Sequence, residues 1–353
     1  MEYLVLVLVL VLAAANGAND VPKGVATLAA AGVTKLRTAL IWGTITTAVG
    51  CLVSLTFASK LTALFSTGIV SAAPTAGFAA AVLIGTAAWV ALATWRKLPV
   101  STTHALVGSL LGAGLVFASS SLHWDVLLNK VVGPLLLSVL AAYVLSAIVS
   151  FASRVIAGRT LAKEVADVAL RGEPTSEQVP GGDTTTTVTA QTGLAAAKPR
   201  SLVVITGVHW LTSGFTSFAR GMNDTPKIVA VGSFALVSGM TPNILLFAVT
   251  AVMAIGGLVG GSRVAGRMCC CVTKISHVNG FAANLTTAAL VGLGAFQGLP
   301  MSTTHVSVGA IAGTVGRDLH LIQRKTIRDF VIAWLVTPPF AAAVAALAFL
   351  ALG

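Results

Sequence analysis

Two short polar motifs each occur twice in this chain of 353 residues, and they hold the side chains that could bind ions. NGANDVPK at positions 16–23 returns as RGMNDTPK at 220–227, and LPVSTTHALVG at 98–108 returns as LPMSTTHVSVG at 299–309. The copies lie 204 and 201 residues apart, so their order and spacing are kept. Motifs that recur in register indicate an internal duplication. The chain therefore offers its ligand two sets of binding groups.

The motif at 16–23 and 220–227, which we call the ND motif, places hard oxygen ligands inside an apolar segment. Asp20 and Asp224 are carboxylates, and Asn19 and Asn223 precede them with amide oxygens. A charged side chain inside a membrane costs at least about 2.5 kcal/mol, so an intramembrane aspartate is by default a functional residue. These four residues predict an ion-binding site, with sodium as the candidate metal ion. The simpler alternative is an ion pair between Asp20 and Lys23, which helical spacing permits.

The motif at 98–108 and 299–309, which we call the STTH motif, places hydroxyl groups at the start of a glycine-rich helix. Unpaired N–H groups at a helix N-terminus, together with hydroxyl donors, favour an anion, although helix capping alone would explain a single copy. Two copies that face each other could hold one tetrahedral anion. The predicted anion-binding residues are Ser101, Thr102, Thr103, Ser302, Thr303 and Thr304, with Asp20 and Asp224 beside them. His104 and His305 end the motif and are expected to be hydrogen-bonded core residues rather than a proton relay.

The composition is that of an integral membrane protein. Hydrophobic residues make up 56% of the chain, charged residues 9%, and the mean hydropathy is +0.92. Soluble domains carry about 25% charged residues. The net charge of +11 comes from lysines and arginines between apolar runs, which indicates a topology signal rather than nucleic-acid binding. The cysteines form no Cys-x-x-Cys pair, so a zinc site is not expected.

The apolar runs predict an all-α, polytopic membrane protein, because they suit helices and show no alternating strand pattern. The first run is expected to break, since Leu4–Ala15 gives only about 18 Å of helix and Asn16, Gly17 and Pro22 disfavour its continuation. A matching break is expected at the second ND motif. The expected segments are 4–33, 38–57, 77–95, 101–119 and 131–151, then 202–236, 243–260, 275–296, 302–316 and 327–350.

The two halves are expected to be inverted repeats. Within each half, two paired segments form a hairpin, re-entrant or spanning, so each half crosses the membrane an odd number of times. With both termini outside, 15 lysines and arginines fall in cytoplasmic joints and only Lys60 and Lys130 outside, as the positive-inside rule requires. We predict a first membrane repeat at 1–153, a flexible cytoplasmic linker at 154–200 that is rich in Thr, Gly and Pro, and a second, inverted repeat at 201–353.

The paired motifs resemble the duplicated signature of the inorganic phosphate transporter family, the type III sodium-phosphate symporters. GANDV and GMNDTPK, each followed by a P-x-STTH segment, carry the resemblance, which spans about residues 4–350. It implies a cell-membrane permease that takes up inorganic phosphate with sodium or protons, built from inverted repeats with re-entrant hairpins. It also implies a central site between the ND motifs and the STTH helix starts. A second copy of the chain is a candidate partner beside phosphate, the coupling ion and the lipid bilayer. No cofactor is expected beside the coupling ion, which is sodium or a proton.

The sequence leaves alternatives open. After each ND motif the chain has V-P-K or T-P-K where many family members have V-A-N or V-S-N, so Lys23 and Lys227 replace an amide. Sulfate or another oxyanion is the alternative substrate, although an aspartate beside the anion suits hydrogen phosphate, which has a proton to share. A passive anion channel is a further alternative. An intramembrane hydrolase is disfavoured, because no G-x-S-x-G turn is present, and the chain is expected not to be an enzyme.

Overall fold

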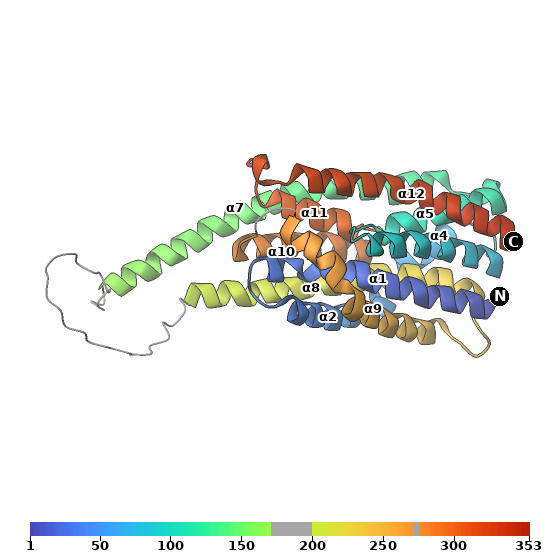
Figure 1. Ribbon diagram of the computed structural model, residues 1–353, viewed down its shortest axis with the longest axis horizontal. Coiled ribbons are helices and arrows are strands. Elements are labelled where there is room, and N and C mark those ends of the chain that lie inside the picture. The colour runs from blue at the N-terminus through green and yellow to red at the C-terminus, as the bar shows by residue number, and fades with distance from the viewer. Residues whose placement is uncertain (171–199, 272–274) are drawn as a thin grey trace.

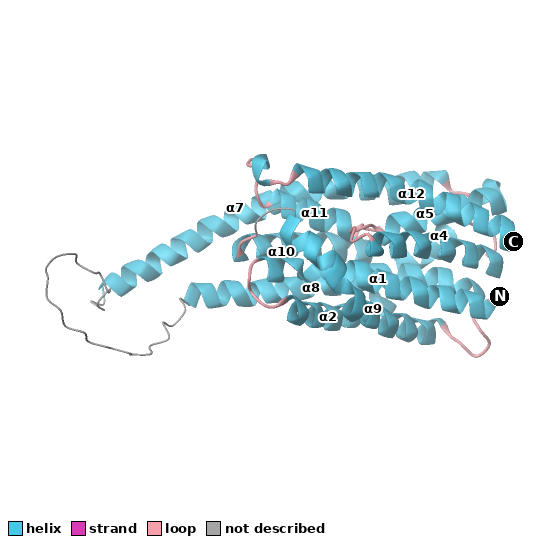
Figure 2. Ribbon diagram, in the orientation of Figure 1, coloured by secondary structure: helices cyan, strands magenta, loops and turns pink. Residues whose placement is uncertain are grey.

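The computed structural model describes residues 1–170, 200–271 and 275–353, and these residues are almost entirely helical (Figure 2). Within these ranges the only β-type pairing is an isolated bridge between Val70 and Leu122. The all-α prediction is confirmed. The expected segments also agree with the observed helices to within a few residues at most ends.

The first half of the chain forms two long helices, a helical hairpin and a third long helix. α1 and α2 come first, α4 and α5 form the hairpin, and α7 follows after short helical turns (Figure 1). The bounds are α1 Glu2–Ala30, α2 Leu36–Phe57, α3 Ser59–Ala63, α4 Ala76–Trp95, α5 Thr102–Ala118, α6 Trp124–Val126 and α7 Gly133–Leu170.

The second half repeats this order. Two long helices are followed by a hairpin, α10 and α11, and then by one long helix. The bounds are α8 Arg200–Gly232, α9 Pro242–Cys271, α10 His277–Gln297, α11 Thr303–Gly313 and α12 Arg324–Leu352. The duplication of motifs is therefore matched by a duplication in the order of helices.

The expected breaks in the ND helices are wrong. α1 runs without interruption through the motif with Pro22 inside it, and α8 does the same with Pro226 inside it. A proline removes one backbone donor, and packing against neighbouring helices compensates for that loss within a membrane protein. The polar side chains also find partners along the helix, since Asn16 donates to Asp20 four residues on at 3.1 Å. The motif is therefore satisfied by its side chains without opening the backbone.

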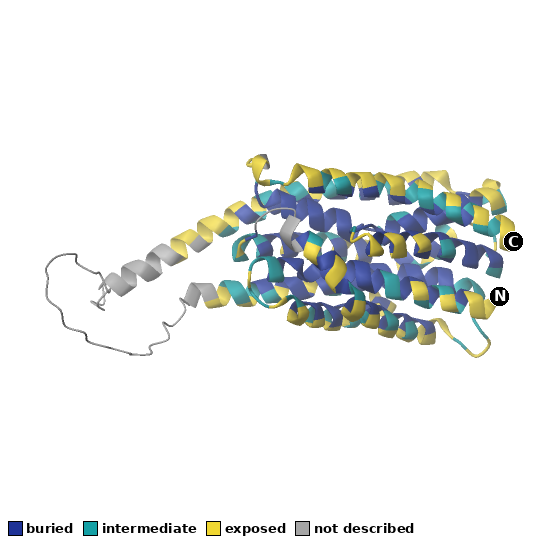
Figure 3. Cartoon of the chain, in the orientation of Figure 1, coloured by how far each residue is buried: buried dark blue, intermediate teal, exposed yellow. Residues whose placement is uncertain are grey.

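The helices have the length and the surface of membrane spans. Among the described residues, eight helices are long and apolar enough to cross a membrane. Figure 3 shows exposed positions along the outer faces of the bundle and buried positions between the helices. Many exposed side chains are large and apolar, such as Leu136, Leu140 and Ile148 on α7 and Leu335 and Leu347 on α12. Such an apolar outer surface suits contact with lipid chains.

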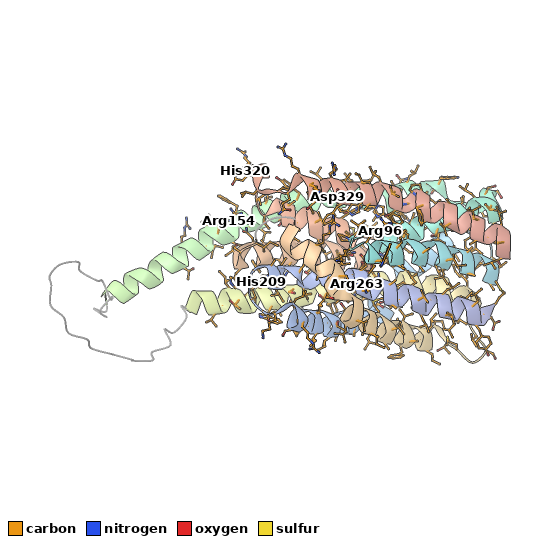
Figure 4. All side chains as sticks on the ribbon, in the orientation of Figure 1. Arg96, Arg154, His209, Arg263, His320 and Asp329 are labelled. Carbon is orange, nitrogen blue, oxygen red and sulfur yellow. The ribbon has the colours of Figure 1, made fainter. Side chains whose placement is uncertain are left out.

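The two hairpins enter the bundle from opposite ends and their tips meet near its middle (Figures 1 and 2). Both termini lie at the end from which α4 and α5 enter, whereas α7 and α8 project from the other end. Figure 4 places Arg96, which follows α4, well inside the length of the bundle. Hairpins that enter from opposite ends are the arrangement that inverted repeats predict. That they are re-entrant, and that the repeats are inverted, stay predictions.

The helices of the two halves are interleaved. α1 packs closely on α9, because a Cβ on Gly17 would lie 1.9 Å from the carbonyl oxygen of Met253. α8 packs on α2 in the same way, because a Cβ on Gly221 would lie 2.3 Å from the carbonyl oxygen of Thr47. Such small residues let membrane helices approach closely. Each half also lends its last helix to the other half's hairpin: α12 packs on α4 and α5, and α7 packs on α10 and α11.

The start of the predicted linker is helical. α7 continues to Leu170, and the Arg154 guanidinium donates to the backbone carbonyl of Thr314 and, at 3.0 Å, to Ser150. Figure 4 shows Arg154 on α7 and His209 on α8 near the end from which these helices project. Anchoring by Arg154 carries the helix past the expected boundary. Residues 171–199, on which the rest of the linker prediction falls, lie outside the described residues.

Candidate binding site between the hairpin tips

The structure brings the predicted site residues together where the hairpin tips meet the ND motifs. The tips are residues 96–101, between α4 and α5, and residues 298–302, between α10 and α11. Every predicted site residue is at most 5% exposed. They are Asn19, Asp20, Ser101, Thr102, Thr103, Asn223, Asp224, Ser302, Thr303 and Thr304. Buried polar groups need partners to offset their lost hydration, so the contacts of these side chains stabilise their positions.

The first arm of the site comes from α1 and consists of Asn16, Asn19, Asp20 and Lys23. Lys23 pairs with Asp20, one helical turn before it. Its ammonium also donates to the Val100 carbonyl at 2.6 Å and to the Thr304 hydroxyl at 2.5 Å. The ion pair that the sequence offered as the simpler alternative is therefore present, and it reaches both hairpins.

The second arm comes from α8 and consists of Arg220, Asn223, Asp224 and Lys227. Lys227 lies 3.4 Å from Asp224 and donates to the Thr103 hydroxyl at 2.7 Å. It also donates to the Met301 carbonyl at 3.4 Å. Each lysine thus contacts the aspartate of its own helix, the backbone of its own half's tip and a threonine of the other hairpin.

The two asparagines that precede the aspartates hold the backbone of the tips. Asn19 accepts from the N–H of Val100 at 3.1 Å and donates to the Leu98 carbonyl at 3.0 Å. Asn223 accepts from the N–H of Met301 at 3.3 Å and donates to its carbonyl at 2.9 Å. The amide oxygens that we expected to bind an ion accept backbone N–H groups in this conformation. Asn19 and Asn223 therefore position the tips.

Asn16 and Arg220 occupy the same place in the two motifs and contact each other. Arg220 donates to the Asn16 side-chain oxygen at 3.1 Å and lies 3.8 Å from Asp224. Asn16 donates to Thr102 at 2.9 Å, to Asp20 at 3.1 Å and to Asp224 at 3.4 Å. These two residues join the arms, and sequence reasoning did not include them. Their shared first position in the repeated motif was the available signal.

The threonine hydroxyls lie within the cluster. Thr103 donates to the Met301 carbonyl at 3.2 Å, and Thr304 donates to the Val100 carbonyl at 2.6 Å. Each thus bonds the tip of the other hairpin. Thr102 lies 3.4 Å from Asp20. Each of these three hydroxyls therefore lies beside a charged group: Thr102 beside Asp20, Thr103 beside Lys227 and Thr304 beside Lys23.

The two motif serines act as helix caps. Ser101 accepts from the N–H of His104 and Ser302 from the N–H of His305, each at 3.2 Å. The histidine rings lie edge to face with centroids 4.4 Å apart, and His104 Nδ1 is 2.8 Å from the Ser101 hydroxyl. They face an apolar cavity of about 330 Å³ that Trp334 also lines. His104 fits the expected role of a hydrogen-bonded core residue, whereas neither ring nitrogen of His305 has a hydrogen-bond partner among the described residues.

The cluster carries more positive than negative formal charge. The two arms hold three cations, Lys23, Arg220 and Lys227, against two carboxylates, Asp20 and Asp224. A proton that moves between members of a pair leaves this sum of +1 unchanged. Ion pairs are stronger in a water-poor interior than in water. A buried centre with one uncompensated positive charge favours an anion.

Comparison with known proteins places these features in a family. The model of the phosphate transporter family matches residues 16–345, which includes both ND and both STTH motifs. The chain belongs to the phosphate transporter family. Its members are transporters, which agrees with the expectation that this chain is not an enzyme. With its apolar helices, the chain is a multi-pass membrane protein.

Individual relatives share sequence across most of the chain. A protein of Rhizobium meliloti described as a "Probable low-affinity inorganic phosphate transporter" is 28% identical over 348 residues, covering 95% of this chain and 92% of the relative. A protein of Bacillus subtilis with the same description is 26% identical over 280 residues, covering 76% and 72%. A solved structure titled "The sodium-dependent phosphate transporter" has the same fold, with a TM-score of 0.77, 24% identity and coverage of 99% and 98%.

Proposed function

We propose that this protein is a secondary active transporter of inorganic phosphate, driven by sodium or proton entry. The anion binds between the ND motifs and the STTH helix starts. The buried +1 cluster at the meeting point of the hairpins is the observation that carries this proposal. The descriptions of the relatives support phosphate as the substrate.

The donors around the cluster suit a tetrahedral oxyanion. Two helix N-termini, those of α5 and α11, begin at the tips and bring backbone N–H groups and hydroxyls toward the centre. Arg220 and the two lysines supply the positive charge. A phosphate would replace some of the present contacts, for example those that Thr103 and Thr304 make with the lysines. Asp20 and Asp224 would accept the proton of hydrogen phosphate, which a sulfate lacks.

An approach to the cluster lies beside the first arm. Thr94, Trp95 and Arg263 line a cavity of about 300 Å³ between the α4 end of the first tip and α9. Thr94 accepts from Asn19 at 2.9 Å, so this cavity adjoins the site. A positively charged side chain in such a cleft raises the local anion concentration. The cavity therefore suits an entrance or exit for phosphate.

The opposed hairpins suggest how access alternates. If the halves are inverted repeats, movement of one hairpin opens the site to one side and the equivalent movement of the other opens it to the opposite side. We place both termini outside and the linker in the cytoplasm, as the distribution of lysines and arginines predicts. Asp20 and Asp224, with Asn19 and Asn223 beside them, are the candidate groups for coupling the anion to a cation.

Uptake into proteoliposomes tests the proposal. We expect radiolabelled phosphate to accumulate above equilibrium when a sodium or proton gradient is imposed, and to lose this accumulation when the gradient is collapsed. Sulfate at the same concentration serves as the comparison. Preferential uptake of sulfate would assign another substrate, and uptake that never exceeds equilibrium would indicate a channel.

A further inference from the structure

We infer that the ammonium groups of Lys23 and Lys227 are built-in cations that take the place of sodium at the two aspartates. Phosphate binding then does not require sodium, and proton entry supplies the driving force for uptake of the anion. This inference rests on the proposed function and narrows its coupling ion. It follows from the contacts of the two lysines.

Each ammonium group has the surroundings of a bound cation. Lys23 contacts the Asp20 carboxylate, the Val100 carbonyl and the Thr304 hydroxyl. Lys227 contacts the equivalent three kinds of oxygen, from Asp224, Met301 and Thr103. Carboxylates, carbonyls and hydroxyls are hard oxygen ligands, and carbonyl groups near the midplane hold coupling ions in other transporter folds. Both positions are therefore built for a cation, and both already hold one.

The lysines also bridge the two hairpins, as a bound ion would. Lys23 on α1 reaches Thr304 at the start of α11, and Lys227 on α8 reaches Thr103 at the start of α5. Removal of a bridging ion would free the tips to separate. A lysine cannot leave its helix, so these contacts can re-form in every transport cycle without an ion binding from solution.

Charge opposes a further cation at either position. Both lysines are 2% exposed, and the cluster already carries a formal charge of +1 with Arg220. Repulsion between like charges is strong in a water-poor interior. A sodium ion at Asp20 would either lie beside the Lys23 ammonium or displace it into a region without another carboxylate in contact. Neither arrangement stabilises the ion.

Sodium titration of the purified full-length chain tests the inference directly. The dissociation constant of radiolabelled phosphate is measured in sodium chloride and in choline chloride at equal ionic strength. We expect the two values to differ by less than about fivefold, the lower end of usual coupling between ligand sites. The midpoint of thermal unfolding should also be the same in sodium chloride as in choline chloride. A ligand that binds the folded state would raise this midpoint. A rise of the midpoint with sodium, or sodium-dependent phosphate binding, overturns the inference.

A double variant provides the converse test. Lys23→Asn combined with Lys227→Asn removes both ammonium groups. It leaves beside each aspartate a shorter, neutral side chain whose amide oxygen can coordinate a cation. We expect phosphate binding by this variant to become at least about fivefold tighter in sodium than in choline, with a sodium-dependent rise of the thermal midpoint. Lys130→Asn, at an exposed position, is the matched control and should behave as the unmodified chain.

The two proposals fail in different ways. If the unmodified chain binds no phosphate in either salt, the proposed function fails, and the sodium series of thermal midpoints still decides the inference. If it binds phosphate only in sodium, the function stands and the inference fails. A double variant that does not fold leaves the sodium titration of the unmodified chain as the deciding measurement, whereas a folded variant that ignores sodium contradicts the inference.

Discussion

The two arms of the site use the same motif but differ at its first position. The first arm begins with Asn16 and the second with Arg220, whereas the asparagine, aspartate and lysine positions are the same in both. Asp224 therefore lies between two cations, Arg220 and Lys227, while Asp20 has Lys23 as its ion-pair partner. The repeated motif gives the two arms equivalent positions. The exchange of asparagine for arginine at the first position gives the two arms different charges.

This difference in charge gives the two arms different roles. The symmetric contacts of the lysines and asparagines hold the hairpin tips together. The single arginine gives the centre its net positive charge, and Asn16 connects that charge to Asp20. If the difference between the arms matters, matched substitutions at equivalent positions must have unequal effects.

Replacement of the aspartates should show the largest difference. Asp224→Asn leaves two buried cations without a carboxylate, whereas Asp20→Asn leaves one. Removal of one partner of a buried pair costs about 3–5 kcal/mol, so both variants are destabilised and Asp224→Asn more strongly. Thermal unfolding in detergent measures this. Both variants should lose concentrative phosphate uptake; normal accumulation by Asp20→Asn would refute its place in the site, and equal midpoints would refute the inequality.

Arg220→Asn makes the two arms alike and brings the formal charge of the cluster to zero. A unit charge at about 7 Å, with an effective dielectric constant of about 20, contributes about 2 kcal/mol to anion binding, or about thirtyfold in Kd. We expect phosphate affinity to fall by about that factor. Equilibrium binding of radiolabelled phosphate measures the change, and Arg37→Asn at an exposed position is the control. Unchanged affinity would show that the arginine has only a packing role.

The two threonines that contact the lysines should differ from each other by less than the two aspartates do. Thr304→Val and Thr103→Val each remove a hydroxyl that bonds an ammonium group, and such bonds contribute about 1.5–3 kcal/mol. Thr304 has the shorter contacts, 2.5 Å to Lys23 and 2.6 Å to Val100, so its loss should lower the thermal midpoint further. Thr67→Val, at an exposed position, should change stability by less than about 0.5 kcal/mol. The reverse order of the two midpoints would contradict this account.

The serine caps should give the smallest effect. Ser101→Ala and Ser302→Ala each remove a helix cap, at a cost of about 1 kcal/mol. Ser101 also bonds His104 Nδ1, so its replacement should cost slightly more than that of Ser302. Glycine is a better N-cap residue than alanine. Ser101→Gly and Ser302→Gly should therefore have higher midpoints of thermal unfolding than the alanine variants. Loss of phosphate binding without a change in stability would instead assign the serines to the anion.

Much of the fold and the place of the site could be predicted from the sequence. Long apolar runs fix the helices, because a membrane allows few other structures. The recurrence of the ND and STTH motifs predicted that Asp20, Asp224 and the threonines lie together, and the structure brings them together. Local propensity failed at Pro22, because it counts the lost hydrogen bond and not the packing of α1 on α9 that compensates it.

The contacts between the halves could not be predicted from either motif alone. Lys23 was weighed as a partner of Asp20, yet its ammonium also contacts Thr304, which lies 281 residues further on. Asn16 and Arg220 meet only because α1 and α8 converge at the centre. Such pairs depend on how the helices cross. A sequence pattern indicates which face of a helix is buried but not which other helix packs against that face.

The interleaving of the halves has a consequence for biosynthesis. When α1 enters the membrane, the helix that covers Gly17 is still unmade, since α9 begins at Pro242. The α4–α5 hairpin likewise waits for α12, which begins at Arg324. The first half must therefore stay in the bilayer with its inner surfaces open until the helices of the second half have been translated. A chain cut within residues 171–199 should regain its packing only when both fragments are produced in the same cell.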